Sequence, residues 1–140
     1  MKIWIVYAFL SMFCAGLTSV IAKKGLENLS ADLGMAIRTL FVFGFTLIFA
    51  LIAVGRSELT EIKQQNCVWL GVSAFTTFLS WVFYYRAIKL GEVSTVALID
   101  KGSIVIAVIF ATLFLHESVT LTKIAGAMCI VAGLFIIALG

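Results

Sequence analysis

Two neighbouring charged residues, Asp100 and Lys101, lie in the middle of an apolar run from Val93 to Leu115. Ionised side chains are costly in the hydrocarbon region of a bilayer, and those found there usually face a protein interior or a water-filled cavity. Such residues usually mark the path of a solute, an ion or a proton. The pair therefore predicts a membrane transporter in which Asp100 binds a substrate, a proton or another cation.

Further basic side chains are expected at a depth similar to that of Asp100. At a rise of about 1.5 Å per residue, Arg38 would lie about 7 Å and Asp100 about 10 Å below one membrane face, where Lys23 would end another helix. Together with Lys101, these residues form a predicted cluster of three cations and one anion. Such a cluster favours a carboxylate or phosphate on the substrate, while Asp100 is expected to pair with Arg38 or to bind a proton or a cation. The alternative is structural, with Asp100 paired locally to hold helices together and the basic side chains reaching the lipid headgroups.

Polar and aromatic side chains complete the predicted substrate site. Residues three or four apart share one helix face, and three such faces carry hydroxyl groups or small side chains. From these faces we predict that the cavity is lined by Thr18, Ser80, Trp81, Tyr84 and Ser103. Close helix packing is the alternative for the hydroxyl groups, because small residues let backbones approach. An aromatic belt at the membrane interface is the alternative for Trp81 and Tyr84.

The elements that must position these side chains are transmembrane helices. The chain has 140 residues, of which 63% are hydrophobic and 12% charged, contains no proline, and has a mean hydropathy of +1.18. A span needs about 20 mostly apolar residues. The expected helices are residues 3–22, 33–54, 67–85, 93–115 and 121–140. They predict one all-α transmembrane domain over residues 1–140, and the first helix is expected to be retained because it is longer than the apolar core of a signal peptide.

Composition and motifs argue against several other classes of protein. The chain has no glycine-rich phosphate loop, nucleophile elbow or His-Glu-x-x-His motif, so we expect no enzyme and no cofactor. The three cysteines, Cys14, Cys67 and Cys129, lack the spacing of metal ligands, and His116 has no neighbouring ligand cluster, so no metal site is expected. The net charge of +3 is divided between both membrane faces, which argues against a nucleic-acid partner.

The loop charges predict a weak preference of orientation. Lysine and arginine normally accumulate in cytoplasmic loops, but here four lie on each expected side, with Arg38 and Lys101 inside the spans. Counting these two favours an outside N-terminus, whereas the near balance is also typical of dual insertion. Five helices place the termini on opposite sides of the membrane, and many transporters contain two inverted repeats. We therefore expect an antiparallel homodimer or a heterodimer with a similar short chain, joined through residues 121–140.

Several stretches together resemble the drug/metabolite transporter superfamily, and most closely its single-repeat, five-helix EamA-type members. They are Gly16-Leu-Thr, Lys23, Gly25-Leu-Glu, Ala36-Ile-Arg-Thr, Tyr85 to Gly91, Val96 to Ser103, Leu115-His-Glu and Gly126 to Gly133. The resemblance implies a multi-pass carrier of small metabolites or drugs in the prokaryotic cytoplasmic membrane. It also implies that the chain is one five-helix half of an EamA fold, completed to ten helices by dimerisation.

The chain departs from the family pattern at two positions. Leu98 stands where the family often has a proline before Ile-Asp-Lys, and His116 replaces a glycine before Glu117. Proline is a principal cause of helix kinks, so its loss puts in doubt any kink or backbone opening near Asp100.

Three functions agree with these observations. The first is a secondary carrier that works by alternating access in a dimer, with Asp100, Lys101 and Arg38 as the substrate or proton site. The second is an accessory subunit of a heteromeric transporter. The third is a subunit of a flippase for lipid-linked substrates, in which the cationic cluster would bind lipid headgroups. In each case the partners are a small-molecule substrate, membrane lipid and a second chain.

Overall fold

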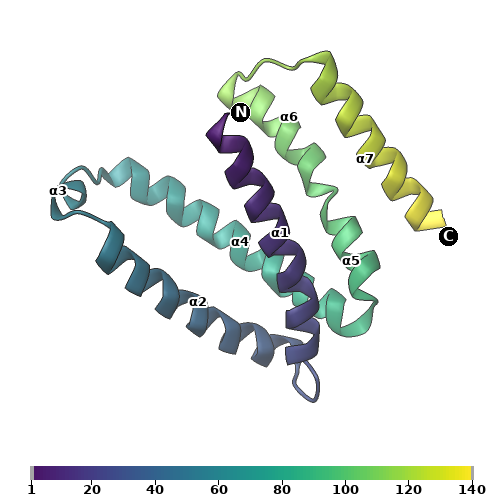
Figure 1. Ribbon diagram of the computed structural model, residues 1–140, viewed down its shortest axis with the longest axis horizontal. Coiled ribbons are helices and arrows are strands. Elements are labelled where there is room, and N and C mark those ends of the chain that lie inside the picture. Colours follow the sequence, from purple (N-terminus) through teal and green to yellow (C-terminus); the bar gives the residue numbers. More distant parts are fainter. Residues whose placement is uncertain (1, 140) are drawn as a thin grey trace. The chain divides into compact units, whose positions relative to one another are not determined.

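The computed structural model describes residues 2–139, with side chains described for residues 2–137, and its regular structure over this range is helical. The helices are α1 (Ile3–Gly25), α2 (Ala31–Ala53), α3 (Arg56–Leu59), α4 (Gln64–Leu90), α5 (Val93–Asp100), α6 (Ser103–Leu115) and α7 (Leu121–Leu139) (Figure 1). In this part of the chain, 4 segments are long and apolar enough to cross a membrane: α1, α2, α4 and the segment that contains α5 and α6. Helix α7 is apolar but shorter. The predicted all-α membrane protein is confirmed.

The first two helices extend beyond their predicted bounds. Helix α1 continues to Gly25 instead of residue 22, and α2 begins at Ala31 instead of residue 33. Ser30 determines the start of α2, because its hydroxyl accepts a hydrogen bond from the Leu33 N–H at 3.2 Å. Asp32 in the first turn adds a negative charge near the positive end of the helix dipole. A local cap therefore begins the helix before its apolar run.

Helix α4 is the longest helix, with 27 residues. The prediction of residues 67–85 was too short at both ends, so Arg86 and Lys89 lie in the last turns of the helix and not in a loop. No glycine or proline interrupts the segment between Gly71 and Gly91, and cations near a helix C-terminus are stabilised by its dipole. The segment before α4 was predicted as a loop but contains the short helix α3.

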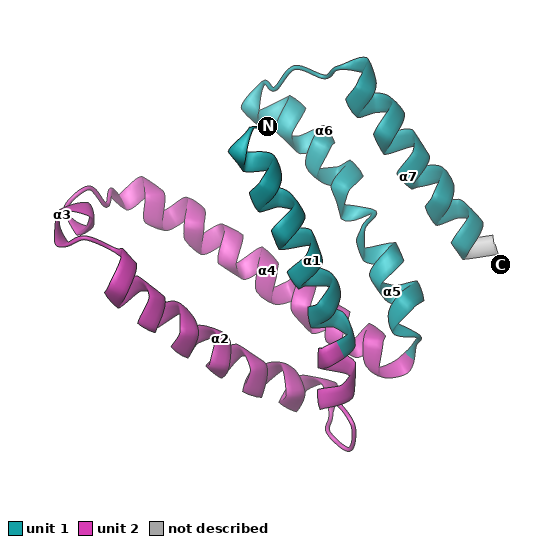
Figure 2. Ribbon diagram, in the orientation of Figure 1, with its two compact units in different colours: residues 1–20, 91–140 teal, residues 21–90 magenta. Residues whose placement is uncertain are grey.

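The chain divides into two compact units (Figure 2). Unit 1 contains residues 1–20 and 91–140, and unit 2 contains residues 21–90. Helix α1 contributes to both units, because the boundary falls near its C-terminal end. The single domain over residues 1–140 remains a prediction from the sequence.

In unit 2, α2 and α4 lie side by side (Figure 1). Three apolar side chains of this unit are buried, namely Leu26, Tyr85 and Ile88. Leu26 follows the end of α1, and Tyr85 and Ile88 lie near the end of α4. The packed core of the unit is therefore at this end of α4. Many other large apolar side chains are exposed. Such surfaces are suited to lipid, since lipid tails are as apolar as leucine.

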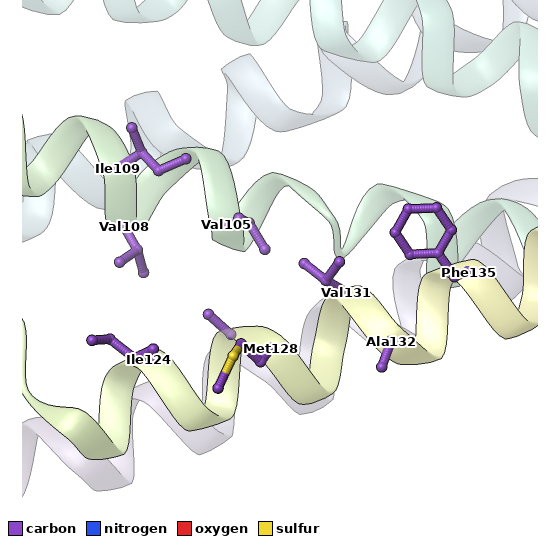
Figure 3. A pocket seen from close by; sticks show the side chains of 9 residues that line it. Val105, Val108, Ile109, Ile124, Met128, Val131, Ala132 and Phe135 are labelled. Atoms are coloured by element: carbon purple, nitrogen blue, oxygen red, sulfur yellow. The ribbon is translucent and has the colours of Figure 1, made fainter.

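In unit 1, α7 packs against both α5 and α6. A groove of about 450 Å³ lies between α6 and α7 and is lined by apolar side chains, with Val108 on one side and Ile124 on the other (Figure 3). The predicted dimer contact on this last helix includes Ala125, Cys129 and Ala132, all of which are exposed. The contact itself remains a prediction.

Candidate functional site

The apolar span from Val93 to Leu115 is divided into two helices at Asp100. Helix α5 ends at Asp100, Lys101 and Gly102 form a turn, and α6 begins at Ser103. The turn is bridged by hydrogen bonds between residues three apart, including Gly102 N–H to the Ile99 carbonyl at 2.9 Å. Such tighter turns often mark functional sites or hinges within helices. The helix is thus interrupted by a turn although Leu98 stands in place of the proline, and the backbone groups of this turn remain hydrogen-bonded.

Gly102 leaves room for a close contact at this turn. A Cβ atom at this position would lie 2.9 Å from Leu134 Cδ1 of α7 and 3.0 Å from the Ile99 carbonyl oxygen. The absence of a side chain therefore lets Leu134 approach the backbone at the turn. Glycine also has the largest conformational entropy to lose within a helix, which weakens the helix at this point.

The two charged residues lie together where α5 ends. Lys101 is the C-terminal cap of α5, where the helix dipole favours a cation, whereas Asp100 is the last residue of α5, where the dipole disfavours an anion. The Lys101 Nζ atom lies 3.8 Å from the Asp100 Oδ2 atom, and the Asp100 side chain is 39% exposed. This ion pair is long and partly open, so the carboxylate can accept a hydrogen bond or a proton without losing a tightly bound partner.

Arg38 is the predicted basic residue that contacts aromatic side chains. Its Cζ atom lies 4.5 Å from the centre of the Trp81 ring and 6.0 Å from that of the Tyr85 ring, both on α4. Trp81 and Tyr85 are four residues apart and share one face of the helix. Arg38 and Trp81 are thus brought together in unit 2, while their role in substrate binding remains a prediction. Asp100 belongs to unit 1, so its pairing with Arg38 remains a prediction.

Lys23 takes part in a reciprocal set of helix caps. Its ammonium group donates to the carbonyl of Ile88 and, at 3.5 Å, to that of Lys89. The ammonium group of Lys89 in turn donates to the carbonyl of Leu26 at 2.7 Å. Carbonyl groups at helix C-termini lack partners within the helix, and lysine side chains can satisfy them. These contacts give Lys23 a structural role, while its role in substrate binding remains a prediction.

A second contact in unit 2 joins the start of α2 to the end of α4. The Arg86 guanidinium group donates to both carboxylate oxygens of Asp32, at 3.0 and 3.2 Å. Arginine and carboxylate groups fit each other in this two-bond geometry. Sequence reasoning missed this pair because Asp32 and Arg86 were both read as loop residues. The two residues are 54 positions apart, and no sequence pattern predicts that they form an ion pair.

The remaining predicted residues are distributed over both units. Thr18 and Ser103 belong to unit 1, whereas Ser80 and Tyr84 belong to unit 2. Thr18 donates its hydroxyl proton to the Cys14 carbonyl at 2.8 Å, which is a bond within its own helix. Ser80 and Ser103 are exposed, and Tyr84 is half-buried. Their contribution to one cavity remains a prediction.

These observations define a class: a small multi-pass α-helical membrane protein with a charged pair at a helix break inside one of its spans. Comparison with known proteins specifies the class further. The model of the EamA-like transporter family matches residues 2–139. A protein of Sinorhizobium sp. named "Uncharacterized transporter in cobO 3'region" is 36% identical over an alignment of 137 residues that covers 96% of each chain. No solved structure matches the chain.

The chain belongs to the EamA-like transporter family. The resemblance to EamA-type members of the drug/metabolite transporter superfamily is thereby confirmed. The family and the name of the relative point to a membrane transporter rather than an enzyme.

Proposed function

We propose that the protein is a secondary transporter of small metabolites or drugs in which Asp100 is the essential acid. One observation carries this proposal: the apolar span breaks at an aspartate that has a loose ion pair with Lys101. Transporters commonly form substrate and ion sites at discontinuous helices, where helix ends and backbone groups face the solute. Ser103, the first residue of α6, adds a hydroxyl group beside the break.

The cost of the charges supports a function over mere packing. Insertion scales assign about 2.5–3.5 kcal/mol to one charged residue at the centre of a transmembrane helix. Neutral side chains at this turn would avoid that cost. In the proposed cycle the Asp100 carboxylate exchanges its contact with Lys101 for a proton or a cationic group of the substrate. Because the two states differ by one charge at the break, they can favour different arrangements of α5 and α6.

The proposed functional unit is a dimer in the cytoplasmic membrane of a prokaryote. A single chain of this length supplies one set of helices, whereas alternating access in many transporters requires two inverted sets. The relative from Sinorhizobium sp. supports the bacterial location. An antiparallel homodimer would supply both sets from one chain, and the near balance of the loop charges supports that choice.

Labelling from each side of the membrane tests the antiparallel homodimer. A variant without Cys14, Cys67 and Cys129 would carry one new cysteine at Ser57 of α3, which is an exposed residue. We expect a membrane-impermeant maleimide to label about half of the molecules in sealed cells and the rest after lysis. Labelling of all molecules from one side would contradict the antiparallel homodimer and favour a heterodimer.

Flux by the purified protein tests the transporter itself. A thermal-shift screen against metabolites identifies stabilising solutes, and each is then loaded into proteoliposomes that contain this chain alone. We expect exchange of at least one radiolabelled solute above the level of protein-free liposomes. Flux that appears only after addition of a second, similar chain would contradict the homodimeric carrier and assign an accessory role.

A further inference from the structure

Arg38 has no acceptor for its guanidinium protons within unit 2. Its contacts there are to the Trp81 and Tyr85 rings. No acidic residue of the unit forms an ion pair with Arg38: Asp32 binds Arg86, Glu27 pairs with Lys24 at 2.7 Å, Glu58 of α3 accepts from the Gly55 N–H, and Glu61 follows α3. An arginine carries five N–H donors and no acceptor. The half-buried Arg38 guanidinium group therefore retains donors that a ligand can use.

The second unused donor is the hydroxyl group of Tyr85. The residue is only 4% exposed, and its oxygen atom has no hydrogen-bond partner among the described residues. A buried hydroxyl group without a partner costs about 1–3 kcal/mol. Phenylalanine would fill nearly the same volume without this cost. The Tyr85 ring is also one of the two rings that contact Arg38.

Trp81 orients the arginine for a planar ligand. A guanidinium group over an indole ring is held by the cation–π attraction, which contributes about 0.5–2 kcal/mol. When a guanidinium group stacks on a ring through its face, its N–H bonds lie in the plane of the group and remain available. In this plane, arginine binds carboxylate and phosphate oxygens through two parallel hydrogen bonds.

We infer that Arg38 and Tyr85 bind an oxyanion, a carboxylate or a phosphate, beside the Trp81 ring. The inference rests on the proposed transport function and specifies its substrate as a solute that carries such a group. An oxyanion would accept from the Arg38 N–H groups and from the Tyr85 hydroxyl, and so satisfy the donors that the described residues leave unused. A phospholipid headgroup offers the same phosphate chemistry, so the experiment includes a separate lipid measurement.

Trp81 fluorescence provides a direct binding assay. In a Trp4→Phe, Trp69→Phe background, Trp81 is the remaining tryptophan and reports movement of the guanidinium group from its ring. The purified protein in a non-ionic detergent is titrated with sodium phosphate, sodium acetate and sodium chloride at constant ionic strength, so that screening does not change. We expect saturable changes with phosphate and acetate and none with chloride. Short-chain phosphatidylglycerol is titrated in parallel.

Two substitutions separate binding from structure. Arg38→Gln is expected to weaken the apparent affinity about tenfold or more, because it removes charge-assisted hydrogen bonds. Tyr85→Phe is expected to weaken it about three- to tenfold, while the thermal unfolding midpoint stays equal or rises, since an unpartnered hydroxyl is removed. Arg56→Gln and Tyr7→Phe are the matched controls, both at exposed positions, and should leave the affinity unchanged.

Equal affinities in the parent, Arg38→Gln and Tyr85→Phe proteins would overturn the oxyanion site. Saturation by phosphatidylglycerol without any response to phosphate or acetate would retain the oxyanion site but assign its ligand to the bilayer. That result would overturn the specified substrate class. The assay measures no flux, so its failure leaves the proposal for Asp100 intact, and a failure of the flux experiment leaves this site intact.

Discussion

Replacement of Asp100 by asparagine is expected to lower solute flux in proteoliposomes about 10- to 100-fold. Asparagine keeps the size of the side chain but removes the charge and the site of protonation. A hydrogen bond to a charged group contributes about 1.5–3 kcal/mol, and each 1.4 kcal/mol corresponds to tenfold. The measurement is the initial rate of exchange of a solute found in the thermal-shift screen, at equal protein density in the membrane.

Two further variants show whether a loss of flux comes from the missing carboxylate at position 100. Asp100→Glu keeps the carboxylate and should retain part of the flux, whereas Glu61→Gln removes an exposed carboxylate after α3 and should retain all of it. If Asp100 only stabilised the helix break, Asp100→Asn would lower the thermal unfolding midpoint, and the loss of flux would follow from that loss of stability. Full flux in a correctly inserted Asp100→Asn protein would refute the proposed role.

Leu26→Ala is expected to destabilise the protein by about 2–5 kcal/mol, the range found when a buried leucine is truncated. Leu26 is 2% exposed and lies in the turn after α1. Its Cδ2 atom occupies the space beside Gly34 of α2. A Cβ atom at Gly34 would lie only 2.2 Å from that Cδ2 atom. Truncation would leave a cavity at the packed end of unit 2. The change is measured as the thermal unfolding midpoint in detergent.

The control for this truncation is Leu90→Ala at the end of α4. Leu90 is 90% exposed, so the same chemical change should leave the midpoint nearly unchanged. Gly34→Ala tests the contact from its other side. The added methyl group would overpack Leu26, and such changes cost about 1–3 kcal/mol. Equal midpoints for the Leu26 and Leu90 variants would show that this end of unit 2 is not a packed core.

Much of the architecture follows from local properties of the chain. The hydropathy of the runs around Phe13, Phe45 and Ile109 predicts helices because a span in lipid must satisfy its own backbone hydrogen bonds. The position of Asp100 and Lys101 within such a run was also evident without any structure. Their place at a helix break was not, because the sequence around Leu98 lacks the proline that usually causes one.

Contacts between residues far apart in the chain explain the rest of the candidate site. The stacking of Arg38 on Trp81 and Tyr85 depends on how α2 and α4 lie together, and periodicity within each helix does not specify that arrangement. The same holds for Lys89, which was expected in a loop and instead caps the turn after α1. A lysine near a helix end predicts capping, but the carbonyl group that it reaches belongs to another element.

The sequence alone therefore determined the membrane-spanning class, the family and the acid that we propose as essential, since hydropathy, charge and motifs are properties of consecutive residues. Only the tertiary structure decided where the span is interrupted and which donors lack partners. At the interruption Leu134 lies against Gly102, and the unused donors depend on the surroundings of Arg38 and Tyr85. Burial and close approach are properties of pairs of helices, so they become defined only when the chain has folded.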